Sequence, residues 1–206
     1  MEKLADVRFP VHEVIARRWS PVTFSERPVS AEQLGSLIEA ARWAASCYNE
    51  QPWRFIVATK EEPESYAKLL GCLVEKNKAW AQSAPVLMVA VAAQSYEGNG
   101  KPNHWAEHDV GMAVMSILFE ATAVGLRAHP MAGFDNDAVR EAFGVPEGYK
   151  PITAIAVGYM GDMGTAAEEH RQRDEALRSR RPIESLAFSR TWGKTAWFIE
   201  ESDRKD

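Results

Sequence analysis

The stretch that decides the fold is SAEQLGSLIEAARWAASCYNEQPWRFIV, residues 30–57. Its first part spaces apolar residues three and four apart, as one face of a helix requires, over residues 30–45. Ser30 is the expected N-cap, and Gln33 completes a capping box. The last part, Trp53–Thr59, is rich in strand-forming residues. The stretch therefore predicts a helix, a polar turn and a strand in succession.

Further elements are expected along the rest of the chain. Apolar periodicity predicts helices over 64–73, 103–125 and 135–143, of which the second is the longest and the third is N-capped by Asp135. Strands are expected over 85–93 and 152–158, with a short extended piece at 126–129.

The C-terminal residues 166–206 form a charged and broken tail that still carries aromatic side chains. These are Phe188, Trp192, Trp197 and Phe198. A solvated tail has little reason to contain them, so we expect it to pack against something, in particular a second subunit. We expect residues 1–206 to be one domain, with 166–206 as an arm on the partner.

Composition narrows the class of protein. The chain has 206 residues, 46% hydrophobic and 26% charged, with a net charge of -5, which suits a folded protein and disfavours a nucleic-acid partner. The longest apolar run, residues 85–93, is about half of the ~20 residues a membrane helix needs, so no membrane segment is expected. The beginning of the chain lacks the pattern of a secretory signal. The two cysteines suit a reducing compartment, and a cytoplasmic protein is expected.

Residues 17–24, RRWSPVTF, offer a candidate anion site. Guanidinium groups at Arg17 and Arg18, with the hydroxyl of Ser20, are equipped to hold a phosphate through charge-assisted hydrogen bonds. The alternative is a solvated basic helix end that complements the helix dipole.

Two further turns offer groups that suit a flat heteroaromatic ligand. Asn49 and Gln51 each provide an amide donor and an acceptor for the polar edge of a ring system, although Asn49 also fits an ordinary turn. In HPMAGFD, residues 129–135, the small Ala132 and Gly133 allow backbone N–H groups to approach a ligand closely, although a glycine in a plain turn is the alternative.

Read in order, these segments resemble the FMN-dependent nitroreductase family. The resemblance rests on residues 19–24, the helix and N-x-Q-P-W-x-F motif of 30–57, the helix 109–125, residues 130–134 and IAVGY at 155–159. It implies an α+β fold with a central, mostly antiparallel sheet flanked by helices. It also implies an intertwined homodimer with FMN at the subunit interface.

The resemblance also implies roles for individual residues. Arg18 and Ser20 would hold the FMN phosphate, Asn49 and Gln51 would contact the ribityl chain and isoalloxazine, and Ala132 and Gly133 would face flavin N5. Cys47 and Tyr48 would line the adjoining wall. One arginine of RSRRP would return to the phosphate, with Arg180 the first choice. The whole expected cofactor-binding set is Arg17, Arg18, Ser20, Cys47, Tyr48, Asn49, Gln51, Pro130, Met131, Ala132, Gly133, Arg178, Arg180 and Arg181.

Two positions depart from the family pattern. Val22 stands where a third phosphate cation is usual, so FMN is expected to be held less tightly unless the C-terminal arginines compensate. Ala132 stands where some members carry an acidic residue, which bears on substrate or nucleotide preference.

The implied activity is transfer of hydride from NADH or NADPH to a small acceptor such as a nitroaromatic, a quinone or an activated alkene, with ping-pong kinetics. The chemistry would belong to the flavin, so no catalytic side chain and no metal are expected. One alternative is a flavin-binding protein without reductase turnover. A second, less favoured one is a zinc peptidase using His104, Glu107 and His108, which fit an H-x-x-E-H pattern.

Overall fold

The computed structural model describes residues 2–202, and these divide into two units between Ala176 and Leu177. The elements of the first unit are α1 (Glu13–Arg17), α2 (Ala31–Arg42), the 3-10 turn η1 (Cys47–Asn49), β1 (Trp53–Thr59), α3 (Pro63–Gly71), α4 (Glu75–Ala81), β2 (Val86–Ala93), α5 (Ala106–Ala123), β3 (Arg127–Met131), α6 (Asn136–Phe143), β4 (Tyr149–Gly158) and α7 (Glu168–Glu175). The second unit contains the 3-10 turn η2 (Ile183–Ser185) and α8 (Trp197–Ser202).

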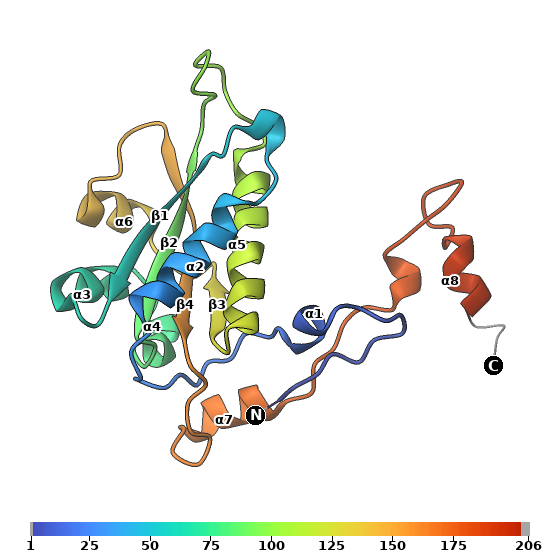
Figure 1. Cartoon of the computed structure of the whole chain (residues 1–206), viewed down its shortest axis with the longest axis horizontal. Coiled ribbons are helices and arrows are strands. Elements are labelled where there is room, and N and C mark those ends of the chain that lie inside the picture. Colours follow the sequence, from blue (N-terminus) through green and yellow to red (C-terminus); the bar gives the residue numbers. More distant parts are fainter. Residues whose placement is uncertain (1, 203–206) are drawn as a thin grey trace. The chain divides into compact units, whose positions relative to one another are not determined.

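The four strands form one antiparallel sheet in the order β1-β2-β4-β3 (Figure 1). β2 is central and buried on both faces, which explains why its sequence is a nearly continuous apolar run. β3 is an edge strand, and its Pro130 fits there because proline donates no hydrogen bond to a neighbouring strand. The expected α+β fold with an antiparallel sheet is confirmed.

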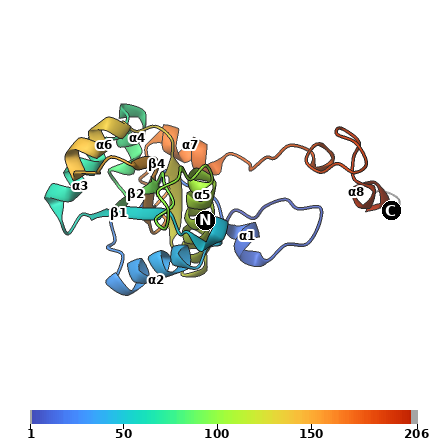
Figure 2. The same ribbon diagram turned by 90° about the horizontal axis from the view of Figure 1, so that it is seen from above.

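Helices cover both faces of this sheet (Figure 2). Even-numbered β2 residues such as Met88 and Ala90 pack in a core with α2 and α5, whereas Leu87 and Val89 pack in a second core with α3, α4 and α6. The alternation follows from the two-residue period of a strand. The first unit therefore has a helix–sheet–helix arrangement.

Capping interactions set the start of α2 and the end of α5. Ser30 caps α2, and the predicted capping box with Gln33 is present. α5 ends at Ala123 because Gly125 adopts φ +80°, and the amide of Leu126 then donates to the carbonyl of Ala121 at 2.7 Å. This is a Schellman motif, and it turns the chain directly into β3.

The segment from Ser20 to Arg27 is held to the body by buried polar contacts. Asp174 of α7 is 1% exposed, and its carboxylate accepts hydrogen bonds from the amides of Val22 at 3.0 Å and Thr23 at 2.9 Å. The Val22 side chain is 1% exposed in the core. The chain between α1 and α2 is thereby fixed against both α7 and the sheet.

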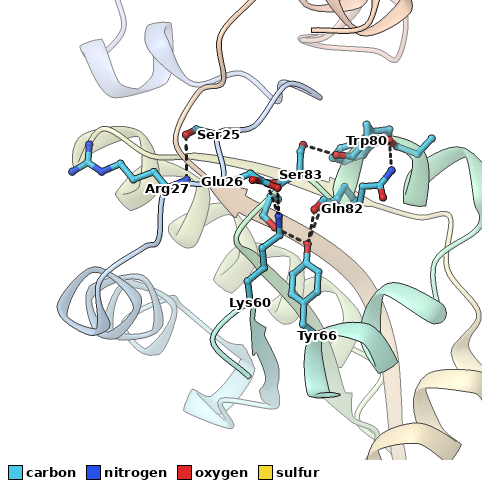
Figure 3. Close-up of polar contacts among 11 residues, drawn as sticks. Ser25, Glu26, Arg27, Lys60, Tyr66, Trp80, Gln82 and Ser83 are labelled. Atoms are coloured by element: carbon cyan, nitrogen blue, oxygen red, sulfur yellow. Dashed lines mark hydrogen bonds and ion pairs between the residues drawn. The ribbon is translucent and has the colours of Figure 1, made fainter. Parts of the chain in front are cut away.

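A second polar group, drawn in Figure 3, ties the same segment to β1 and α4. Lys60 pairs with Glu26 at 3.0 Å and also donates to the Ser83 carbonyl at 3.4 Å. The Tyr66 hydroxyl donates to the carbonyl of Ala84 at 2.6 Å. Burial, and then the negative charge of Glu26, raise the pKa of Tyr66 to about 12, so its hydroxyl stays a donor.

The second unit has a small core of its own. Phe188 bridges to Thr195, its ring lies 5.0 Å from that of Trp192, and Ala196 and Ile199 are buried. Large apolar side chains such as Leu177 and Trp192 are more than nine-tenths exposed. α7 belongs to the first unit, and the expectation that residues 166–206 form an arm on a partner subunit stays a prediction.

Replacing Asp174 by Ala should destabilise the protein by about 3 kcal/mol, because two buried amides lose a charged acceptor. The measurement is urea unfolding followed by circular dichroism. Glu175→Ala, one residue further along the same helix and exposed, is the control and should cost less than about 0.5 kcal/mol. Equal unfolding midpoints for the two variants would show that the Asp174 carboxylate does not anchor this segment.

Candidate functional site

The first part of the predicted site lies where α1 passes the start of β3. Arg18 ends α1, and its Nη1 donates to Ser20 Oγ at 3.2 Å. Ser20 Oγ in turn donates to the Ala128 carbonyl at 3.3 Å, which fixes the hydroxyl at the edge of the sheet. The structure thus brings Arg18 and Ser20 together, as the sequence predicted.

Other cations gather around this pair. Arg17 pairs with Glu2 at 3.0 Å, and positive charge from Arg17 contributes to lowering the pKa of Arg127, for which burial is the main cause. Arg173 and Arg18 likewise lower the pKa of His129, although burial of the imidazole is again the main cause. Arg127 and Arg173 were not recognised from the sequence. An arginine inside a short apolar strand was the signal that could have pointed to Arg127.

Val22 lies beside this cluster but does not contribute to it. Its side chain is buried in the core, and its backbone amide is bound to Asp174. Residue 22 therefore serves in this chain to anchor the segment rather than to present a charge. The consequence for FMN affinity stays a prediction.

The second part of the predicted site, Cys47–Gln51, is a turn with an unusual backbone. Tyr48, Asn49 and Gln51 have φ values of 55°, 58° and 52°. Non-glycine residues in this region cost about 1–3 kcal/mol each and tend to cluster at functional sites. The turn is held by Asp109, which is 1% exposed and accepts the Cys47 amide at 3.0 Å.

Aromatic side chains and a hollow lie next to this turn. The Tyr48 side chain is 90% exposed and meets the edge of the Tyr96 ring, whose hydroxyl contacts Cys47 Sγ at 3.7 Å. The hydrogen bond with Cys47, more than burial, raises the pKa of Tyr96 to about 12. Gln51 and Tyr96 both line a hollow of about 290 Å³. These groups suit a planar ligand with polar edges.

The two parts are far apart within one chain. The Cys47 turn is bonded to the first part of α5 at Asp109, whereas Ser20 contacts β3, which begins after the last turn of α5 (Figure 1). The rise along α5 from Asp109 to Ala123 is roughly 20 Å at about 1.5 Å per residue. A single chain therefore does not bring Arg18 and Asn49 onto the same small ligand.

The third part, residues 130–133, comprises the last two residues of β3 and the turn after it, at the end of the strand away from Ser20. Met131 is 4% exposed, so its side chain belongs to the core and only its backbone faces the edge. The carbonyl of Gly133 accepts from the Val74 amide at 3.1 Å and from Asn77 Nδ2 at 3.0 Å. At about 3.3 Å per residue, Ala128 and Gly133 are roughly 15 Å apart. One edge of the sheet thus offers cations at one end and a small-residue turn at the other.

Asn77 and α4 were not predicted. The segment Glu75–Ala81 carries a single large apolar residue, Trp80, and its N-cap Val74 makes no side-chain cap hydrogen bond. Neither an apolar stripe nor a capping residue marks this helix in the sequence. Its role is clear in the structure, since Asn77 and Val74 fix the position of Gly133.

The pattern HWAEH does not form the expected pair of imidazoles on one helix. α5 begins at Ala106, so His104 lies in the preceding turn, while His108 Nδ1 contacts Asp109 at 3.1 Å. Glu107 pairs with Lys150 at 2.6 Å. Within residues 2–202, no three His, Cys, Asp or Glu side chains are grouped to hold a metal ion. The geometry gives the zinc-peptidase alternative no support.

Arg178, Arg180 and Arg181 lie in the second unit. Burial, and then repulsion from Arg180, lower the pKa of Arg178, while Arg180 is exposed and donates to the Ser179 carbonyl at 2.7 Å. Their expected contact with a phosphate stays a prediction.

The contacts of Gly133 predict a cost for any side chain there. A Cβ at this position would lie 2.7 Å from Asn77 Nδ2 and 2.8 Å from Val74 Cγ2, so Gly133→Ala should destabilise the protein by about 1–3 kcal/mol in urea unfolding. Gly35→Ala is the matched control, because it lies inside α2 with nothing within 4 Å of its Cβ. It should stabilise by roughly 0.5–1 kcal/mol. A Gly133→Ala variant as stable as the wild type would mean that this turn is not tightly packed.

Comparisons with known proteins agree with this geometry. A crystal structure described as an oxidoreductase containing FMN is 30% identical, with a TM-score of 0.86 over 92% of this chain and 96% of that one. A protein of the ask 5′ region in Mycolicibacterium smegmatis is 36% identical over 63% of this chain and 86% of its own length. A Xanthomonas oryzae protein with the provisional name NADH dehydrogenase/NAD(P)H nitroreductase is 28% identical over 75% of this chain and 88% of its own length.

The sequence model of the Nitroreductase family matches residues 15–159. This range begins inside α1 and ends just after β4, so it contains every predicted site residue except Arg178, Arg180 and Arg181. The chain belongs to the nitroreductase family.

Proposed function

We propose that this protein is an FMN-dependent oxidoreductase that takes hydride from NADH or NADPH and passes it to a small acceptor. Nitroaromatics, quinones and activated alkenes are the acceptor classes. The observation that carries the proposal is the cationic group around Arg18 and Ser20 at one end of β3, with the Gly133 turn at the other. An elongated ligand with a phosphate at one end and a flat ring at the other matches that edge.

The residues present fit the phosphate of FMN. Arg17, Arg18 and the Ser20 hydroxyl offer charge-assisted donors, and Arg127 adds a buried guanidinium whose Nε has no hydrogen-bond partner within residues 2–202. An unpartnered buried donor is costly, which favours binding of an anion here. The relative that contains FMN at 30% identity supports the same assignment.

A second copy of the chain would complete the site. The Cys47–Gln51 turn is too far from Arg18 to share a ligand within one chain, so we infer that each site combines β3 of one protomer with this turn of its partner. α5 presents an apolar stripe on its outer face, formed by Met112, Met115 and Phe119, of which Met115 is 42% exposed. A helix that is apolar on nearly every side needs a partner on each.

Each part of the chain has a separate task in the proposed reaction. Bound FMN supplies the hydride chemistry, and the protein supplies binding, orientation and polarity. Arg18 and Ser20 would hold the phosphate, the amides of Ala132 and Gly133 would face the ring, and Asn49 and Gln51 of the partner subunit would contact its polar edge. Donor and acceptor would use the same open face in turn, which gives ping-pong kinetics.

The assignment is tested on the purified protein by its absorption spectrum and by identification of the released flavin. We expect bound FMN rather than FAD, oxidation of NADH or NADPH by a quinone, and parallel lines in double-reciprocal plots. Bound flavin without turnover across all three acceptor classes would favour a flavin-binding protein. Stoichiometric zinc without flavin would overturn the proposal.

The expected cytoplasmic location stays a prediction. Cys47 and Cys72 are both free thiols. No helix within residues 2–202 is long and apolar enough to span a membrane.

Arg18→Ala should raise the Kd for FMN by about 10- to 100-fold, since a hydrogen bond to a charged group contributes roughly 1.5–3 kcal/mol. The measurement is flavin fluorescence quenching on apoprotein. Arg42→Ala removes an equally charged residue that pairs with Glu39 on the surface of α2, and it should leave the Kd within twofold. Equal affinities for the two variants would exclude Arg18 from the phosphate site.

Met115→Arg should dissociate the proposed dimer, because a charge would lie in the middle of the outer stripe of α5. Sedimentation velocity reports the mass, and flavin content should fall together with dimer content. Glu64→Arg on α3, which packs on the opposite face of the sheet, is the control and should leave the mass unchanged. A monomeric wild type that still holds FMN would disprove the shared site.

A further inference from the structure

Arg127 is a buried arginine that forms no ion pair with any residue from 2 to 202. It is the first residue of β3 and only 9% exposed. Its Nη1 donates to the neighbouring Leu126 carbonyl at 2.8 Å, and its buried Nε has no hydrogen-bond partner among residues 2–202. A guanidinium stays charged under all ordinary conditions, so this group cannot escape the cost of burial by losing its proton.

The neighbours of Arg127 increase that cost. Burial, and then repulsion from Arg17, lower the pKa of its guanidinium, while the negative charge of Glu2 raises it. Glu2 Oε1 is 3.0 Å from Arg17 Nε, and the Glu2 side chain is 61% exposed. Glu2 therefore pairs with Arg17, the more exposed of the two arginines, and not with Arg127. A buried charge that lacks a partner typically costs several kcal/mol, which a protein keeps only where the charge has a use.

We propose that Arg127 recognises the phosphate of the cofactor and supplies the cationic contact that Val22 does not. This inference rests on the proposed function, and it assigns to the phosphate site a residue that the sequence did not suggest. Arg17, Arg18 and Arg127 carry three positive charges, and Glu2 carries one negative charge. This excess of positive charge suits a phosphate monoester, which carries about −1.5 to −2 at neutral pH.

The position of Arg127 supports this role. The residue that follows it, Ala128, accepts the hydrogen bond from Ser20 Oγ at 3.3 Å, and Ser20 is bonded to Arg18. Because Arg127 is on the edge strand β3, one side of its backbone has no neighbouring strand. Arg173 is a further cation close by, and with Asp174 and Arg18 it acts on His129, two residues further along β3.

The test compares FMN with riboflavin, which has the same ring and ribityl chain but no phosphate. Arg127→Met keeps an unbranched side chain that can pack where the arginine stem lies, and it removes the charge. The Kd of the apoprotein for FMN should rise about 10- to 100-fold, while the Kd for riboflavin stays within twofold. The urea midpoint of the apoprotein should be unchanged or higher, because a poorly compensated buried charge has been removed.

Three further measurements separate the outcomes. Arg42→Met is the matched control and should change neither affinity. If Arg127→Met does not fold, Arg127→Lys decides, since it keeps the charge and loses the fork of donors; its ratio of FMN to riboflavin affinity should fall severalfold. An unchanged ratio in the folded variant overturns this inference and leaves the proposed function standing. A wild-type protein that binds neither flavin overturns the proposed function itself.

Discussion

The apolar character of helix α5 on nearly every side is the constraint on which the rest of the structure depends. One side packs on the sheet and another on α2, where Ser36 also donates to Glu120 at 2.6 Å. The helix cannot lie at the surface of an isolated unit without exposing Met115 and its neighbours. Its length also separates the Cys47 turn from the Ser20 end of β3, so the same helix that organises the core divides the candidate site into two halves.

Much of this fold could be predicted because its elements are marked by local signals. The bounds of β1 were predicted without error, and the caps of α2 and α6 lie at Ser30 and Asp135 as the sequence indicated. α4 and α7 were not predicted, since neither carries an apolar stripe or a side-chain cap. Each is held by contacts with distant residues, Gly133 for α4 and Val22 for α7, and such contacts have no signature in a local window.

The candidate site, like the fold, could be predicted only in part from the sequence. Arg18, Ser20, Asn49 and Gln51 were visible because they belong to a motif with a recognisable order. The distance between the two halves of the site, and the burial of Val22, depend on tertiary packing. The spacing of residues in the sequence carries no information about either. Arg127 was read only as part of a short extended piece, and its meaning comes from its burial beside Arg17. The sequence thus indicated the kinds of contact at this site but not their number or their arrangement.

The cationic end of β3 shows how a binding site can conflict with stability. The buried charge of Arg127, which the half-exposed Arg17 repels, opposes folding. Two features nearby fix the chain around it: the carboxylate of Asp174, which accepts from the amides of Val22 and Thr23, and the imidazole of His129, whose Nδ1 is 2.7 Å from the Pro21 carbonyl. Burial lowers the pKa of that histidine, so it adds no further positive charge to the cluster at neutral pH. Because the surrounding contacts hold the backbone, the charges do not need to stabilise one another. An anion that enters this end meets donors already in place, and little of its binding free energy is lost in ordering them.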